Sequence, residues 1–217
     1  MAATFVDSTT QVDLASTACT IAVPTHSEGD LLIALCLANA ASPPGEWTRP
    51  VGWTETGGNQ TGDSLLQMCT KIASGSEPVD YEWTHNNSGD LCIIMLSYSG
   101  AALTSPSDHF SDQGSVYTCP TAESDNDDQV VLRWYGSIGD TTETITVPAA
   151  TTERAEIEQS ALWSAVGEQT QATAGSTGTE AFTTSGTGTD RICLTYVITN
   201  AGWEAVARPS AFMLFVD

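Results

Sequence analysis

Positive charge is scarce in this sequence. Lys71 is the only lysine, and the 217 residues include 6 Lys and Arg against 27 Asp and Glu, which gives a formal net charge of -21. A surface with this charge repels phosphate backbones and anionic membrane surfaces. We therefore expect neither nucleic acid nor a membrane as a partner. Mutual repulsion of the carboxylates should also keep the protein in solution.

Long apolar runs and targeting signals are also missing. No apolar run approaches the length that a membrane span needs. The first residues, Met1–Asp7, have neither the basic start nor the apolar stretch of a secretory signal. These features predict a soluble protein that is made in the cytoplasm of its host cell.

The sequence has no motif of a known catalytic centre. His26, His85 and His109 are scattered over separate segments, and no His-Glu-x-x-His or Gly-x-Ser-x-Gly pattern occurs near them. A pair of glycosidase carboxylates remains open, because such a pair can come from distant strands, but nothing in the sequence nominates one. We expect no enzymatic activity, no catalytic residue and no cofactor.

The cysteines lack the spacing of a metal site or a redox motif. None forms a Cys-x-x-Cys pair or a Cys/His pair at zinc spacing. Cys36, Cys69, Cys92 and Cys193 each lie inside an apolar run, where cysteine behaves as a small hydrophobic residue. Buried free thiols are favoured. A disulfide stays open as an alternative, because the cysteine count is even.

What the sequence does contain is a series of short apolar segments with the character of β-strands. They recur at roughly 8 to 15 residue spacing, with Gly, Pro, Ser and Asn between them, and no long amphipathic helix interrupts them. Leu31–Ala38 is almost uniformly apolar, which predicts a central strand covered on both faces. In Ser64–Ala73 the residues alternate, and we expect the face with Leu66, Met68, Thr70 and Ile72 to be the core face.

Part of the sequence recurs after about 98 residues. Gly29–Ala38 is followed at this separation by Asp127–Arg133, and Pro50–Glu55 is followed by Pro148–Glu153. Proline, threonine and glutamate coincide in the second pair of segments. A repeat of this length, built from short apolar runs, suggests that one supersecondary unit is used twice.

These patterns predict an all-β fold, a jelly-roll-like antiparallel β-sandwich built from two sequence-related halves. We expect residues 1–217 to form a single β-sandwich domain. Within it, 1–17 would be an N-terminal arm or edge strand, and the internal repeats would span approximately 29–100 and 127–199. The apolar segment 211–217 would add a C-terminal strand.

Several segments together resemble a β-sandwich domain of structural proteins from tailed phages and related viruses. The likeness extends roughly over Glu28–Ile198 and rests on turn and core residues of the segments Gly29–Ala34, Pro50–Thr54, Ser64–Ala73, Tyr81–Thr84, Tyr98–Gly100, Thr151–Arg154 and Gln169–Gly178. The resemblance implies a virion component: a capsid decoration or cement protein, a turret, or part of a tail or fibre. It implies no catalytic residues.

One acidic segment is a weak candidate for an ion site. Asp125, Asp127 and Asp128 follow one another closely, and carboxylate oxygens are the ligands that Ca²⁺ prefers. The segment lacks the glycine and the distal glutamate of an EF-hand loop. A solvated turn without metal is therefore the favoured interpretation.

Tryptophans and arginines outside the apolar strands are the candidates for a partner surface. We expect Trp47 and Trp203 to lie in loops, where an aromatic ring is free to contact a partner. Arg49, Arg154 and Arg208 would supply the charged contacts, with Arg191 as a further candidate.

Taken together, these features predict a viral structural protein on the exterior of the capsid. It would be a decoration, cement or turret protein that binds the major capsid protein or another virion protein, and it would form a homo-oligomer. The alternative is a tail or fibre module that binds a receptor or a carbohydrate. In that case Trp47, Trp203 and the segment Gly57–Asn59 would form the contact.

Overall fold

The computed structural model describes residues 2–40, 45–61, 64–103, 107–109, 116–139, 144–159, 161–186 and 189–201. The regular structure in these residues consists of β-strands, so the prediction of an all-β fold is confirmed. Trp203, Arg208 and the predicted strand 211–217 lie outside the described residues.

The first half of the chain contains β1 to β8. Their bounds are Thr4–Ala22 (β1), Leu31–Ala40 (β2), Trp47–Thr48 (β3), Thr54–Thr61 (β4), Ser64–Ile72 (β5), Asp80–Ser99 (β6), Ala101–Leu103 (β7) and Ser107–His109 (β8). The second half contains β9 to β17. Their bounds are Val116–Cys119 (β9), Glu123–Ser124 (β10), Gln129–Ile138 (β11), Ile145–Thr146 (β12), Thr152–Gln159 (β13), Leu162–Gln171 (β14), Gly175–Ser176 (β15), Glu180–Thr184 (β16) and Thr189–Asn200 (β17).

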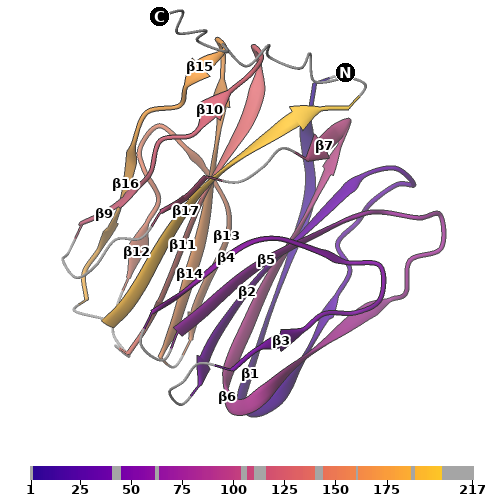
Figure 1. Ribbon diagram of the computed structural model, residues 1–217, viewed down its shortest axis with the longest axis vertical. Helices are drawn as coiled ribbons and strands as arrows, with labels where there is room; N and C mark the ends of the chain where they lie inside the picture. The colour runs from indigo at the N-terminus through magenta and orange to yellow at the C-terminus, as the bar shows by residue number, and fades with distance from the viewer. Residues whose placement is uncertain are drawn as a thin grey trace, which may run out of the picture.

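Two large antiparallel sheets stack face to face (Figure 1). Sheet A has the order β1-β6-β2-β5-β4, with β3 paired to β6. Sheet B has the order β13-β14-β11-β17-β7, with β8 paired to β17. A smaller sheet, β12-β16-β9, and the pair β10-β15 complete the structure. The segment predicted as an arm or edge strand at 1–17 belongs to β1, which forms one edge of sheet A.

The two large sheets have matching strand orders. From one edge, sheet A runs β4-β5-β2-β6 and sheet B runs β13-β14-β11-β17. β4 and β13 begin 98 residues apart, as do β5 and β14. The origin of the halves from one duplicated unit stays a prediction. The jelly-roll part of the prediction is not confirmed, because each large sheet is formed largely by one half of the chain.

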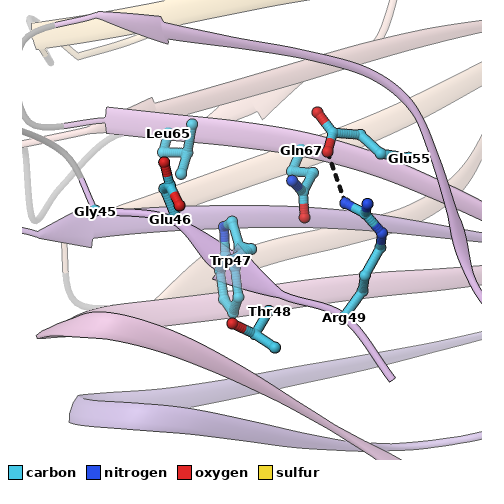
Figure 2. A pocket seen from close by; sticks show the side chains of 8 residues that line it. All are labelled: Gly45, Glu46, Trp47, Thr48, Arg49, Glu55, Leu65 and Gln67. Carbon is cyan, nitrogen blue, oxygen red and sulfur yellow. Dashed lines mark hydrogen bonds and ion pairs between the residues drawn. The ribbon is translucent and has the colours of Figure 1, made fainter. Parts of the chain in front are cut away.

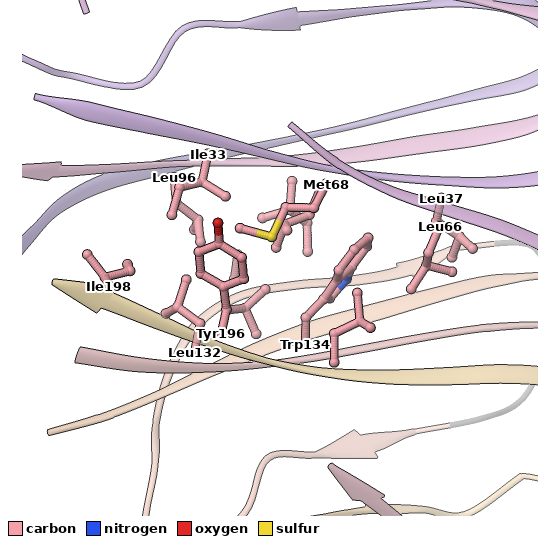
Figure 3. Close-up of a cluster of buried hydrophobic side chains, with 14 of the residues drawn as sticks. Ile33, Leu37, Leu66, Met68, Leu96, Leu132, Trp134, Tyr196 and Ile198 are labelled. Carbon is pink, nitrogen blue, oxygen red and sulfur yellow. The ribbon is translucent and has the colours of Figure 1, made fainter. Parts of the chain in front are cut away.

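The main hydrophobic core lies between sheets A and B (Figure 3). Its side chains come from alternate positions of the facing strands, and those labelled in the figure are Ile33, Leu37, Leu66, Met68, Leu96, Leu132, Trp134, Tyr196 and Ile198. Gly136 lies at the centre of this contact. A Cβ atom there would lie 3.2 Å from both methyl carbons of Leu66, so the glycine allows the sheets to approach closely.

Both sheets are also covered on their outer faces. β6 is 20 residues long, and its first part carries Tyr81 and Trp83 against the outer side of β2. The small sheet β12-β16-β9 covers sheet B in a similar way, with Tyr117 and Phe182 buried against Tyr135. β2 is consequently buried along its length except for partly buried Asn39. This confirms the prediction of a central strand covered on both faces.

The prediction for β5 is correct at its centre and wrong at its end. Leu66 and Met68 belong to the core between the sheets. Ile72, predicted on the same face, is 52% exposed, because it lies at the last residue of the strand. The opposite face is buried as well: Cys69 packs in the outer core of sheet A, and burial raises the pKa of its thiol to about 12.

Arg133 is a fully buried cation in the middle of β11. Its guanidinium donates hydrogen bonds to the carbonyl oxygens of Pro120, Thr177 and Gly178, at 2.6 to 3.1 Å, and to the hydroxyl of Thr195. Among the described residues it makes no ion pair with a carboxylate. Burial therefore lowers its pKa. The side chain ties sheet B to two irregular segments by donating to their carbonyl groups.

We predict that Arg133→Met lowers the free energy of unfolding by roughly 3 kcal/mol, because it removes the hydrogen bonds that the buried guanidinium donates to Pro120, Thr177, Gly178 and Thr195. Urea denaturation at neutral pH measures the change. Arg49→Met is the matched control, because Arg49 lies in an exposed ion pair, and it should lower the free energy by less than about 1 kcal/mol. Equal losses in the two variants would contradict the assigned role of Arg133.

Candidate functional site

The predicted partner arginines are largely occupied inside the protein. Arg154 forms an ion pair of 2.7 Å with Glu168, and its guanidinium lies 4.4 Å from the ring centroid of Phe5. Arg191 is buried, lies over the ring of Tyr117 and donates a hydrogen bond to a backbone carbonyl. The prediction that Arg191 contributes to a partner surface is therefore wrong. Arg154 holds the edges of the two sheets together, since Arg154 belongs to β13 at the edge of sheet B and Phe5 to β1 at the edge of sheet A.

Trp47 is not an exposed loop residue. It lies in β3, pairs with His85 of β6 and is only 5% exposed. Its ring contacts the His85 ring edge to face, with the centroids 5.2 Å apart. The prediction of an exposed ring was wrong because pairing of β3 with β6 folds the tryptophan onto the outer core of sheet A.

The three aspartates of the weak calcium candidate do not form a metal site. In the part of the chain that the structure describes, no three His, Cys, Asp or Glu side chains gather in a group that would hold a metal ion. Asp127 instead accepts a hydrogen bond of 2.7 Å from the backbone nitrogen of Ala174. Asp128 adopts a left-handed backbone conformation with φ of 56°. The segment Asp125–Asp128 is a turn that leads into β11.

A surface pocket of about 530 Å³ lies on the outer side of sheet A (Figure 2). We call it the β3–β5 pocket, and the residues that define it are Glu46, Trp47, Arg49, Glu55, Leu65 and Gln67. They come from the segment around β3 and from the neighbouring strands β4 and β5. The pocket thus brings together Trp47 and Arg49, which the sequence nominated separately.

The wall that carries Trp47 is fixed by backbone contacts with β6. The nitrogen of Glu46 donates to the side-chain oxygen of Asn86 at 2.8 Å, and the nitrogen of Asn86 donates to the carbonyl of Glu46 at 3.2 Å. Gly45 lies directly against these residues, where a Cβ atom would come within 1.9 Å of the Asn86 oxygen. Only glycine fits at this position, so the entry of the chain into β3 depends on it.

The pocket presents both donors and acceptors. Arg49 Nη1 and Glu55 Oε2 are 2.7 Å apart at its rim, with side chains that are 40% and 46% exposed. Gln67 lies deeper and is only 8% exposed. Its side-chain oxygen accepts a hydrogen bond of 3.6 Å from the thiol of Cys69. Its amide nitrogen makes no hydrogen bond to any described residue and is open to solvent in the pocket.

Sequence reasoning missed Gln67. The alternation of β5 places Gln67 on the face opposite the predicted core face, together with Leu65, Cys69 and Lys71. The burial of Gln67 could have been predicted from its neighbours on that face, because Leu65 and Cys69 are apolar. An amide with apolar neighbours on both sides of its face indicates a buried polar group that needs a partner.

A second pocket, of about 380 Å³, lies where β1 and β13 meet. Glu156 and Glu158 line it from β13, opposite Gln11 and Val12 of β1. Burial, together with a hydrogen bond to Glu158 and the negative charges of Glu158 and Glu153, raises the pKa of Glu156 to about 7. At neutral pH the Glu156 carboxyl is therefore partly protonated, which permits a hydrogen bond with Glu158.

This carboxyl predicts a pH dependence of stability. The folded protein holds the Glu156 proton more tightly than the unfolded chain, whose glutamate has a pKa of about 4.5. The free energy of unfolding should therefore fall by about 1 kcal/mol as pH rises from 4.5 to 7, after allowance for solvent screening of this partly exposed group. Glu156→Gln should remove this fall. Urea denaturation at a series of pH values measures it.

Glu82→Gln is the control for the pH series, because Glu82 is exposed on β6 and outside the lining of this pocket. This variant should keep the pH dependence of the wild-type protein. If Glu156→Gln and the wild type gave parallel curves, the assignment of the raised pKa to Glu156 would be wrong.

Comparison of the chain with protein-family models, with curated proteins and with solved structures found no match. No helix in the described part of the chain is long and apolar enough to cross a membrane. Any function must therefore be argued from the fold, the charge and the two pockets.

Proposed function

We propose that the protein is a non-enzymatic viral structural protein, a capsid decoration, cement or turret protein that binds the outer surface of the capsid. The observation that carries this proposal is the distribution of charge over the scaffold. Each cation in the described residues is engaged within the chain: Arg49, Lys71 and Arg154 in ion pairs, and Arg133 and Arg191 in hydrogen bonds to backbone carbonyls. The outer surface therefore carries a large excess of carboxylates.

A scaffold of this kind suits a passive structural role. Two stacked sheets with a core between them and further cores outside form a thick block whose strands pack on both faces. Interiors packed in this way deform little. Carboxylates on such a block favour binding to a neutral or basic partner surface and disfavour nucleic acid. The expected partners are the major capsid protein or another virion protein, together with further copies of this chain.

This function predicts saturable binding to virus particles that lack the protein. Purified protein is added to such particles, and the bound fraction is measured by co-sedimentation at increasing salt concentration. Binding should weaken as salt rises, because the anionic surface contributes to it. Light scattering after size-exclusion chromatography should show an oligomer. A protein that stays monomeric and does not bind the particles would refute the assignment.

The alternative function is a receptor-binding or carbohydrate-binding module of a tail or fibre. The observation that favours it is the β3–β5 pocket, which holds an unpaired amide donor beside an exposed ion pair. Labelled antibodies against the protein distinguish the two functions on intact particles. A decoration protein is labelled over the capsid shell, whereas a fibre module is labelled only at the tail.

A further inference from the structure

We propose that the β3–β5 pocket binds a neutral pyranose sugar, with Gln67, Arg49 and Glu55 as the polar contacts. This inference goes beyond capsid decoration, and it names the ligand class and the binding residues of the alternative, carbohydrate-binding function. It rests on the pocket alone and does not require the protein to lie on a capsid or on a fibre.

The first argument is the unpaired amide of Gln67. The side chain is 8% exposed, and its oxygen is occupied by the Cys69 thiol at 3.6 Å. The amide nitrogen has no hydrogen-bond partner among the described residues, and it is not one of the fully buried atoms left without a partner, so it reaches the solvent in the pocket. Because Gln67 lines the pocket, a ligand oxygen can supply the missing acceptor.

The second argument is the charge of the lining. Glu46 and Glu55 oppose Arg49, so the pocket carries a small negative charge within a protein of net charge -21. This arrangement disfavours phosphate, sulfate and carboxylate ligands. A cationic ligand would meet the guanidinium of Arg49 at the rim. An uncharged polar molecule avoids both repulsions.

The third argument is the pairing of donors with acceptors. Arg49 Nη1 and Glu55 Oε2 lie 2.7 Å apart, which places a donor and an acceptor side by side at the rim. A hydroxyl group both donates and accepts, so two adjacent hydroxyls of a sugar match this pair. The amide of Gln67 adds a further donor at greater depth. Planar polar groups with fixed geometry suit such contacts.

The fourth argument is the shape of the pocket. Gly58 is the cross-strand partner of Gln67 on the edge strand β4, and it has no side chain to cover the amide. A Cβ atom at Gly58 would lie 2.7 Å from the carbonyl oxygen of Leu66, so the position is restricted to glycine. Leu65 and Trp47 supply an apolar wall for the C–H groups of a sugar ring. The volume of about 530 Å³ falls within the range of small-molecule sites.

The test uses the full-length protein and defined sugars. The methyl glycosides of glucose, galactose, mannose and N-acetylglucosamine are screened by saturation-transfer difference NMR, with the methyl glycoside of N-acetylneuraminic acid as the anionic comparison. We expect at least one neutral glycoside to bind and the anionic one not to bind. ¹H–¹⁵N chemical shifts should change for the Gln67 amide group.

Two variants connect binding to the pocket. Gln67→Leu keeps the size of the side chain and removes its donor, and Glu55→Gln keeps the shape of the rim and removes its charge. Each should weaken binding about tenfold. Gln11→Leu is the matched control, because Gln11 lines the other pocket, and it should leave the affinity unchanged. Circular dichroism verifies that each variant folds. If Gln67→Leu does not fold, Glu55→Gln alone tests the proposal, because Glu55 is half exposed and its replacement should not disturb the fold.

The proposal is overturned if no neutral glycoside binds at millimolar concentration, or if binding persists unchanged in Glu55→Gln and in folded Gln67→Leu. Preferred binding of the anionic glycoside would also overturn it. Attachment to particles is measured in parallel with the same variants. Loss of sugar binding with intact attachment separates failure of this proposal from failure of the decoration function.

Discussion

Burial of both faces of each large sheet is the constraint on which the rest of this structure depends. A strand that is covered on both sides must be apolar at every position, and β2 is: it has buried residues from Leu31 to Ala38 without interruption. The long strand β6 contributes to this burial in two ways. Its last part pairs with β2, and its first part helps to cover the outer face of β2. In sheet B two separate strands have these roles: β17 pairs with the central strand β11, and β16 helps to cover the outer face of the sheet.

The need to cover both faces of each sheet also explains where the few cationic side chains lie. A chain with so little basic charge would be expected to keep it at the surface, yet Arg133 and Arg191 are buried where irregular segments cover sheet B. Covering a sheet with short strands leaves carbonyl groups without donors, and a guanidinium supplies several donors from one side chain. Most of the described carboxylates lie at the surface, because burial without compensation raises the free energy of a charged group. The two exceptions are compensated: buried Asp30 accepts a hydrogen bond from the nitrogen of Ser27, and the Glu77 side chain pairs with Lys71. The acidic exterior and the buried arginines thus both follow from covering the two faces of each sheet.

The sequence predicts the strands well because apolar runs and turn residues are local signals. Leu31–Ala38 and Leu91–Tyr98 are found as strands, and the all-β class follows from them. Contacts that depend on distant pairing could not be predicted. In the sequence, the turn residues Asn86–Asp90 separate Tyr81–Thr84 from Leu91–Tyr98, but pairing with β1, β2 and β3 makes these segments one strand, β6. Pairing with β6 likewise buries Trp47, and only this closure makes Gln67 part of a pocket.

The difference between the two sheets explains why the β3–β5 pocket occurs on sheet A. In sheet A the edge residue Gly58 faces Gln67 across the strand pair. In sheet B, 98 residues later in both strands, Glu156 faces Ala165. There the long side chain is on the edge strand and its neighbour on β14 is small. Glu156 lines the pocket between β1 and β13, and its carboxyl has a raised pKa because it is partly buried. In sheet A the positions of the long and the short side chain are exchanged. The long side chain is then on the inner strand, its amide is left uncovered, and a ligand can reach the donor that sheet B does not have.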